Sequence, residues 1–131
     1  METMQAATVV SANGGKTLNV FGIGVDVLLR AEATNGALSS YRVTVQPGDG
    51  VPPHIHEHED ESFFVLIGEF EFVCGDSVTR LMAGSQIFLP RHRAHGFRNV
   101  GAQEGVLLGV SSPAGHERFF EARVVRDGSQ S

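Results

Sequence analysis

Glycine constrains the fold of this chain more than any other residue, because it recurs between short apolar runs along most of the sequence. There are 16 glycines in 131 residues, well above the usual share of about 7% in soluble proteins. They are dispersed rather than clustered, which argues against a flexible glycine-rich linker. The pattern indicates many turns between short strands.

Several of the runs between these turns alternate apolar and polar residues. In residues 38–46, Tyr41, Val43 and Val45 alternate with polar neighbours, which is typical of a strand with one buried face. Further strands are expected over residues 16–33, 62–67, 70–73, 78–81, 86–89, 94–100 and 106–110. About nine or ten short strands at this spacing predict an all-β sandwich or barrel.

One helix and one domain complete the expected organisation. The helix is expected over residues 114–122, because Ser112-Pro113 is a favoured helix start. A chain of 131 residues suffices for one domain with a sizeable core, so residues 1–131 are interpreted as a single domain. Its ends, residues 1–15 and 127–131, are expected to be flexible.

Charge and hydropathy argue against several classes of function. The formal net charge is −5, and no basic run indicates a nucleic-acid footprint. No apolar stretch approaches the roughly 18 residues that a membrane span needs, and the N-terminal residues do not resemble a secretion signal. Cys74 is the single cysteine, so no intrachain disulfide can form. It is expected to be a buried thiol, and a cytoplasmic location is expected.

Ionisable residues gather in the middle of the chain. Five of the six histidines lie between residues 54 and 95. Side chains two apart in a strand share a face and lie about 7 Å apart, so His54 and His56 could converge on one ion. Glu61 would add a carboxylate and His95 a third imidazole. The alternative is that these histidines are ordinary surface or core residues. The acidic Glu57, Glu59 and Asp60 beside them are expected in a solvated loop.

Turn residues frame this cluster at regular spacings. The spacing is Gly48-x5-His54-x-His56-x4-Glu61-x6-Gly68, then Gly84-x5-Pro90-x4-His95-x3-Asn99. Residues 48–68 and 84–99 thus resemble the two signature motifs of the cupin superfamily. The first motif matches at every defining position. The second departs at His92, where the family usually has glycine.

The resemblance implies a double-stranded β-helix, also called a jelly-roll or cupin barrel, with a metal ion at its mouth. It also implies that His54, His56, Glu61 and His95 hold that ion. Three imidazoles and one carboxylate suit one divalent transition metal ion, namely Fe, Mn, Ni, Co, Cu or Zn. Two octahedral positions would remain open for water, substrate or O₂.

Strand alternation then selects the lining of a substrate pocket. Phe63 and Val65 share the face of Glu61, and Phe97 shares the face of His95. This lining predicts a partly apolar or aromatic small-molecule substrate.

The three remaining histidines are expected outside the ligand set. His58 is expected at the surface, and His92 in a turn near the barrel mouth. His116 is expected to be exposed on the helix.

Three functions remain open. Residues 53–69 and 112–120 resemble quercetinase-like single-domain cupins, which favours an enzyme, a metal-dependent dioxygenase or related oxidoreductase acting on a flavonol- or enediol-like substrate. In that case Glu61 would also be the general base. The same ligands could serve an isomerase, lyase or cyclase without oxygen, or a non-catalytic binding protein.

A homodimer is also expected, because cupins commonly pair through their sheets. The N-terminal Val9-Val10 and residues 18–21 could add strands to a partner or fold back on their own barrel.

Overall fold

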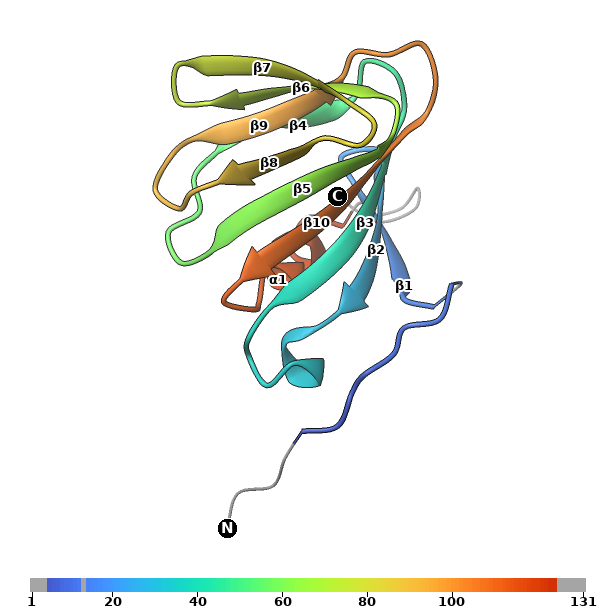
Figure 1. The fold of residues 1–131 in the computed structure, drawn as a ribbon, viewed down its shortest axis with the longest axis vertical. Helices are drawn as coiled ribbons and strands as arrows, with labels where there is room; N and C mark the ends of the chain where they lie inside the picture. Colours follow the sequence, from blue (N-terminus) through green and yellow to red (C-terminus); the bar gives the residue numbers. More distant parts are fainter. Residues whose placement is uncertain (1–4, 13, 125–131) are drawn as a thin grey trace.

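The computed structural model describes residues 5–12 and 14–124, which form two antiparallel β-sheets and one short helix (Figure 1). The six-stranded sheet has the order β1-β2-β3-β10-β5-β8, and the four-stranded sheet has the order β4-β9-β6-β7. The strands are β1 (Lys16–Val20), β2 (Ile23–Leu29), β3 (Ser39–Val45), β4 (Gly50–His54), β5 (Asp60–Ile67), β6 (Glu69–Cys74), β7 (Ser77–Met82), β8 (Gln86–Leu89), β9 (His95–Asn99) and β10 (Gly105–Ser112). A 3-10 turn, η1 (Ala31–Ala33), and the helix α1 (Glu117–Glu121) complete the described elements.

These elements confirm the all-β architecture predicted from turns and alternation, a double-stranded β-helix. The expected flexible ends fall partly on residues 1–4 and 127–131, which lie outside the described residues. Of the described N-terminal residues, Gln5 and Thr8 donate side-chain hydrogen bonds to the carbonyl of Ala33. No helix in the described part of the chain is long and apolar enough to cross a membrane.

The helix is shorter than expected at its start. Strand β10 ends at Ser112, opposite Asp60 of β5, and the first expected residues, 114–116, lie in the irregular connection between the strand and the helix. Gly115 then adopts a φ of 124°, which is outside the helical region. The helix therefore begins only at Glu117.

Strand β4 holds the prolines of the first motif at a sheet edge. An edge strand tolerates proline because one row of its N–H groups needs no partner in the sheet. β4 pairs with β9 through Val51 opposite Phe97 and His54 opposite His95, with a register shift between Val51 and His54. Gly96 allows this approach, because a Cβ there would lie 2.6 Å from the Val51 carbonyl oxygen.

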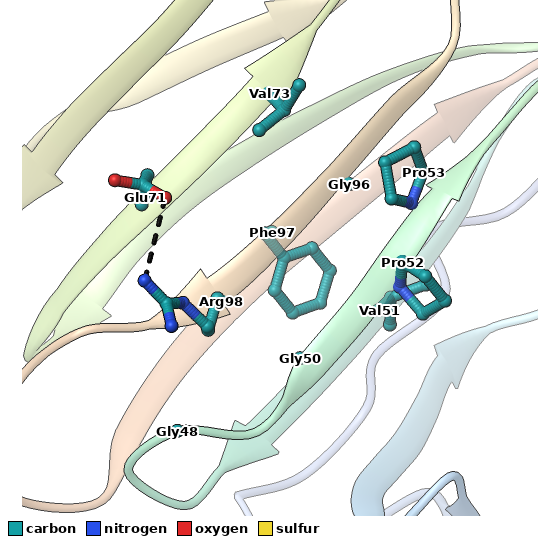
Figure 2. A pocket seen from close by; sticks show the side chains of 10 residues that line it. All are labelled: Gly48, Gly50, Val51, Pro52, Pro53, Glu71, Val73, Gly96, Phe97 and Arg98. Atoms are coloured by element: carbon teal, nitrogen blue, oxygen red, sulfur yellow. Dashed lines mark ion pairs between the residues drawn. The ribbon is translucent and has the colours of Figure 1, made fainter.

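A shallow hollow of about 350 Å³ lies on the outer face of these strands (Figure 2). Its rim carries the Glu71–Arg98 ion pair, with 3.8 Å between Oε1 and a guanidinium nitrogen. Glu71 and Val73 alternate along β6 with the buried Phe70 and Phe72. The hollow therefore faces away from the core.

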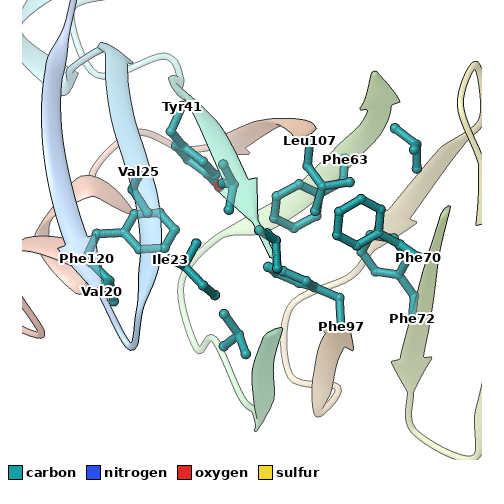
Figure 3. Close-up of a cluster of buried hydrophobic side chains, with 14 of the residues drawn as sticks. Val20, Ile23, Val25, Tyr41, Phe63, Phe70, Phe72, Phe97, Leu107 and Phe120 are labelled. Carbon is teal, nitrogen blue, oxygen red and sulfur yellow. The ribbon is translucent and has the colours of Figure 1, made fainter. Parts of the chain in front are cut away.

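The core lies between the two sheets and is rich in aromatic rings (Figure 3). Phe63 of β5 contacts Phe97 of β9 and Phe72 of β6, with ring centroids 5.5 and 5.8 Å apart. Gly109 leaves the space for this packing, since a Cβ there would lie 2.2 Å from the Tyr41 ring. The cluster joins both sheets and supports one end of the barrel.

Helix α1 is attached to the six-stranded sheet by specific contacts. Phe120 is buried against Tyr41, with ring centroids 5.0 Å apart. The buried Glu117 carboxylate accepts hydrogen bonds from Ser39 Oγ at 2.5 Å and from the Ala31 amide at 2.8 Å. These anchors bring the segment around His116 to the open end of the barrel.

Candidate metal centre

The four residues predicted as ligands come together from three strands and a loop. His54 ends β4, His56 lies in the following loop, Glu61 lies in β5 and His95 begins β9. Ring nitrogens of the three histidines all lie within 4.8 Å of one another. The Glu61 carboxylate lies beside two of them, with Oε1 3.2 Å from His95 Nε2 and 3.9 Å from His56 Nε2.

A neighbouring acceptor decides which nitrogen of the His54 imidazole carries the proton. His54 Nδ1 lies 2.8 Å from the Pro52 carbonyl oxygen, and His56 Nδ1 lies 3.3 Å from Glu59 Oε1. The Nδ1–H of His54 therefore donates to that carbonyl, so its Nε2 presents a lone pair. The two Nε2 atoms lie 3.0 Å apart. The lone pair of His54 Nε2 can accept a hydrogen bond from His56 Nε2–H in the metal-free protein, or bind a cation placed between the two rings.

The separation of these nitrogens also fits one ion. Ligand nitrogens about 2.1 Å from a metal and at right angles to each other are about 3.0 Å apart. The donor set of imidazoles and a carboxylate is suited to a divalent transition metal. The Pro52 carbonyl that binds His54 Nδ1–H orients this ring, as partners of metal-binding histidines usually do.

Burial keeps these imidazoles neutral and ready to bind a cation. Burial lowers the pKa of His56 to about 4, and the positive charge of His116 adds to the shift. Burial likewise lowers the pKa of His54. His95 is buried, and its Nδ1 has no hydrogen-bond partner among the described residues. Little proton competition from His54 and His56 is therefore expected at neutral pH.

The two oxygens of Glu61 have different surroundings. Oε1 faces the histidine cluster, whereas Oε2 accepts a hydrogen bond from Tyr41 Oη and lies 3.2 Å from His116 Nε2. Burial by itself would raise the pKa of Glu61, but the charge of His116 and the hydrogen bonds to the carboxylate hold the pKa well below its usual range. The carboxylate is therefore ionised and held in one orientation.

His116 corrects one prediction from the sequence, because its side chain is 2% exposed rather than on the surface. Burial would lower its pKa, yet the negative charges of Glu61 and Glu59 raise it to about 9. Helical spacing offered a signal for this position. His116 lies four residues before the buried Phe120, and residues four apart share one helix face.

Glu59 also differs from its expected place in a solvated loop. Its side chain is largely buried, and Oε1 lies 3.3 Å from His56 Nδ1 and 3.7 Å from His116 Nδ1. These three residues form a second group whose ligand atoms lie within 4.8 Å of one another. Glu59 therefore belongs to the surroundings of the site.

The other two histidines of this region lie at the surface. His58 is exposed, as expected. His92 is also exposed and has a φ of 72°, which explains why glycine is usual at this turn position. Its Nδ1 lies 3.3 Å from Glu57 Oε1.

The residues predicted to line a substrate pocket are buried in the barrel. Phe63 and Phe97 line a cavity of about 10 Å³ beside His54, Glu61 and His95. Val65 is buried but is not among the residues that line this cavity. The space has room for roughly one water molecule.

Comparison with known proteins places this site in a family. Residues 41–111 match the family described as "Cupin domain". The chain belongs to the cupin family. The ligand candidates His54, His56, Glu61 and His95 all lie within the matched residues.

Two curated relatives come from Streptomyces. The chain is 32% identical over 82 residues to "Protein SchB" of Streptomyces halstedii, covering 61% of this chain and 59% of that protein. It is 29% identical over 87 residues to "Polyketide synthase CurC" of Streptomyces cyaneus, covering 65% and 56%. This cupin thus spans less than two thirds of the length of either relative.

Solved structures share the fold over most of the chain. The structure of KdgF from Halomonas sp. has a TM-score of 0.76 at 21% identity and covers 86% of this chain and 99% of that one. A predicted oxalate decarboxylase from Thermotoga maritima has a TM-score of 0.73 at 27% identity, with 81% and 99% covered. An oxalate oxidase structure has a TM-score of 0.62 at 27% identity, with 72% and 54% covered.

Proposed function

We propose that this cupin is a metal-dependent oxidoreductase, a dioxygenase acting on a small aromatic or enediol-like molecule. One divalent transition metal ion would be held by His54, His56, Glu61 and His95. The observation that carries the proposal is the convergence of the Nε2 atoms of His54 and His56, 3.0 Å apart, with the Glu61 carboxylate beside them. When bound, the ion would supply Lewis-acid and redox chemistry at that point.

The residues of the chain orient and shield this centre. The Pro52 carbonyl and Glu59 hold the imidazoles of His54 and His56, and Tyr41 holds Glu61. The buried aromatic rings exclude bulk water from the site. The ionised Glu61 is placed to act also as the general base that accepts a hydroxyl proton from a substrate.

The aromatic surroundings support the proposed class of substrate. Phe63, Phe97 and Phe119 line the cavity next to the cluster, and flat conjugated molecules pack well against such rings. The neighbouring oxalate oxidase structure supports oxidoreductase chemistry on this fold.

A second candidate is an oxygen-independent cyclase, isomerase or lyase. The relative named as a polyketide synthase favours it, because chains of alternating carbonyl groups can close into rings by way of enolates, which a Lewis acid stabilises.

The test begins with elemental analysis of protein purified without chelators. The protein with its native ion, and protein loaded separately with Fe, Mn, Ni or Co, are then assayed for oxygen uptake with a panel of flavonols and enediols. Oxygen uptake that is lost in Glu61→Gln supports the dioxygenase. Turnover that is equal with and without oxygen supports the second candidate.

Two outcomes would contradict the proposal that this protein is an enzyme. A protein that binds the panel molecules with unchanged affinity in Glu61→Gln and turns none over is a non-catalytic binding protein. A protein that retains no divalent ion has no metal centre at these residues. The matched control is Glu71→Gln, which alters a carboxylate on the outer face of β6.

A further inference from the structure

The ring of Phe119 covers the histidine cluster at the mouth of the barrel. It stacks on His54, with ring centroids 5.1 Å apart and planes at 21°. It also stacks on His116 at 5.0 Å and 10°, and its contact with His56 is edge-to-face at 5.3 Å. One side chain thus contacts two of the candidate ligands and the histidine that contacts Glu61.

Little space is left beneath this ring. His56, His95 and Glu61 are each at most 5% exposed. The cavity that Phe119 lines with them has a volume of about 10 Å³, which suffices for roughly one water molecule. A substrate larger than water can reach the point where the nitrogens converge only if side chains at the mouth move.

Phe119 is less firmly held than the neighbouring residues that anchor α1. Glu117 and Phe120 are buried and attached to the six-stranded sheet, so the backbone of α1 is held in place. Phe119 itself is only partly buried. Its ring also contacts Phe120, with centroids 5.6 Å apart, and the exposed Arg123, whose guanidinium carbon lies 3.8 Å from the ring centroid. Rotation of one side chain would open the site without unfolding the helix.

We propose that Phe119 is a specificity-determining residue that gates the metal centre. This inference rests on the function proposed above. In the observed position the ring excludes molecules larger than water. A substrate enters by displacing it, and a flat conjugated molecule then takes the place of the ring against His54. The gate thereby selects planar oxygen-donor substrates over bulky saturated ones of similar size.

The gate can be tested without knowing the substrate. Co(II) is loaded into the wild-type protein, and its visible spectrum is followed after mixing with azide or with tropolone, a flat aromatic oxygen chelator. If the gate is mostly closed, Phe119→Ala raises the association rates of both probes about tenfold, since both are larger than water and their binding no longer waits for a minor open state. Gel filtration and elemental analysis check that Co(II) stays bound.

Further variants keep the test informative. Phe119→Leu should give an intermediate rate and covers the case in which the alanine variant folds poorly. Val78→Ala is the control, because Val78 is exposed on β7 at the edge of the four-stranded sheet, and it should behave as wild type.

Two results would overturn the proposal in different ways. Unchanged tropolone and azide association rates in Co(II)-loaded Phe119→Ala and Phe119→Leu would show that Phe119 is not a gate, and would leave the proposed metal centre unaffected. Failure of the wild-type protein to hold Co(II) removes the metal centre, and the gate with it.

Discussion

The two carboxylate oxygens of Glu61 have different partners at this site. Oε1 faces the imidazoles of His56 and His95, while Oε2 binds Tyr41 and lies beside His116. An oxygen that already has two donors is poorly placed to bind a cation as well. The arrangement therefore favours a carboxylate that reaches the metal through one oxygen.

Tyr41→Phe tests whether the hydroxyl group of Tyr41 positions Glu61. The change removes a donor to Oε2 but keeps the buried ring that packs against Phe120. We expect the metal affinity to fall by roughly 10-fold or more, as is usual when a partner of a metal ligand is lost. Competition with a chromophoric chelator measures the affinity.

The matched control for Tyr41→Phe is Thr17→Val, which removes a hydroxyl group that binds Asp26 far from the cluster. Equal metal affinity in Tyr41→Phe and wild type would show that Tyr41 does not position Glu61.

In the metal-free protein, the pKa values of two histidines should be shifted in opposite directions. Burial lowers the pKa of His56 to about 4, whereas the charges of Glu61 and Glu59, acting against burial, raise the pKa of His116 to about 9. The stabilisation from His116 is thus complete below its ordinary pKa of 6.5 and is lost as the pH rises through about 9. For His56, stability is lost as the pH falls from 6.5 towards about 4.

Imidazole NMR signals measured across this pH range check both values. Chemical denaturation at each pH then checks whether the free energy of unfolding rises or falls with pH as expected. His116→Gln is the control, because it should abolish the loss of stability between pH 6.5 and about 9. A His116 signal that titrates near 6.5 would contradict the proposed charge pair with Glu61.

At the scale of elements, the pairing of β4 with β9 brings His54 opposite His95. Alternation by itself does not predict this register, because β4 contains two prolines and its pairing has a register shift between Val51 and His54. The strand is held close by Gly96, whose missing side chain leaves room for the backbone of β4.

Gly96→Ala should therefore disturb the site without touching a ligand. The new Cβ would lie 2.6 Å from the Val51 carbonyl oxygen and 2.8 Å from the Pro53 nitrogen. We expect a loss of about 1–3 kcal/mol in the free energy of unfolding, which is typical of overpacking, and weaker metal binding as β4 shifts. Urea denaturation and metal titration measure the two effects.

The matched control for Gly96→Ala is Gly24→Ala in β2, where the nearest atom to an added Cβ is 3.8 Å away. A Gly96→Ala protein as stable as the Gly24→Ala protein would show that the close approach of β4 is not needed.

At the scale of the whole molecule, apolar side chains stand on the outer face of the six-stranded sheet. Phe64, Leu66 and Phe88 are 38%, 47% and 62% exposed. They lie together, because Phe64 pairs with Gln86 and Ser62 with Phe88 across β5 and β8. Exposed apolar groups of this kind often mark contacts with another protein, and we propose that they contribute to a homodimer.

Leu66→Lys places a charge in that face and should shift the protein from dimer to monomer. Analytical ultracentrifugation at several concentrations measures the shift. Arg80→Glu is a control on the separate four-stranded sheet. A wild-type protein that sediments as a monomer throughout would contradict the homodimer.

The sequence by itself determined most strand positions and the four ligand candidates. Alternation and glycine turns are local properties, so they located β3, β5 and β6 to within about two residues. The regular spacing around His54, His56, Glu61 and His95 carried the family resemblance, which the match over residues 41–111 confirms.

Only the tertiary structure decided what surrounds those four side chains. His116, Glu59 and Phe119 reach the cluster because Glu117 binds Ser39 and Phe120 packs on Tyr41, contacts between residues about 80 positions apart in the chain. Local periodicity tells which face of an element a residue occupies, but not which distant element covers that face. The candidate ligands could therefore be named from the sequence, whereas the groups that charge, orient and cover them could not.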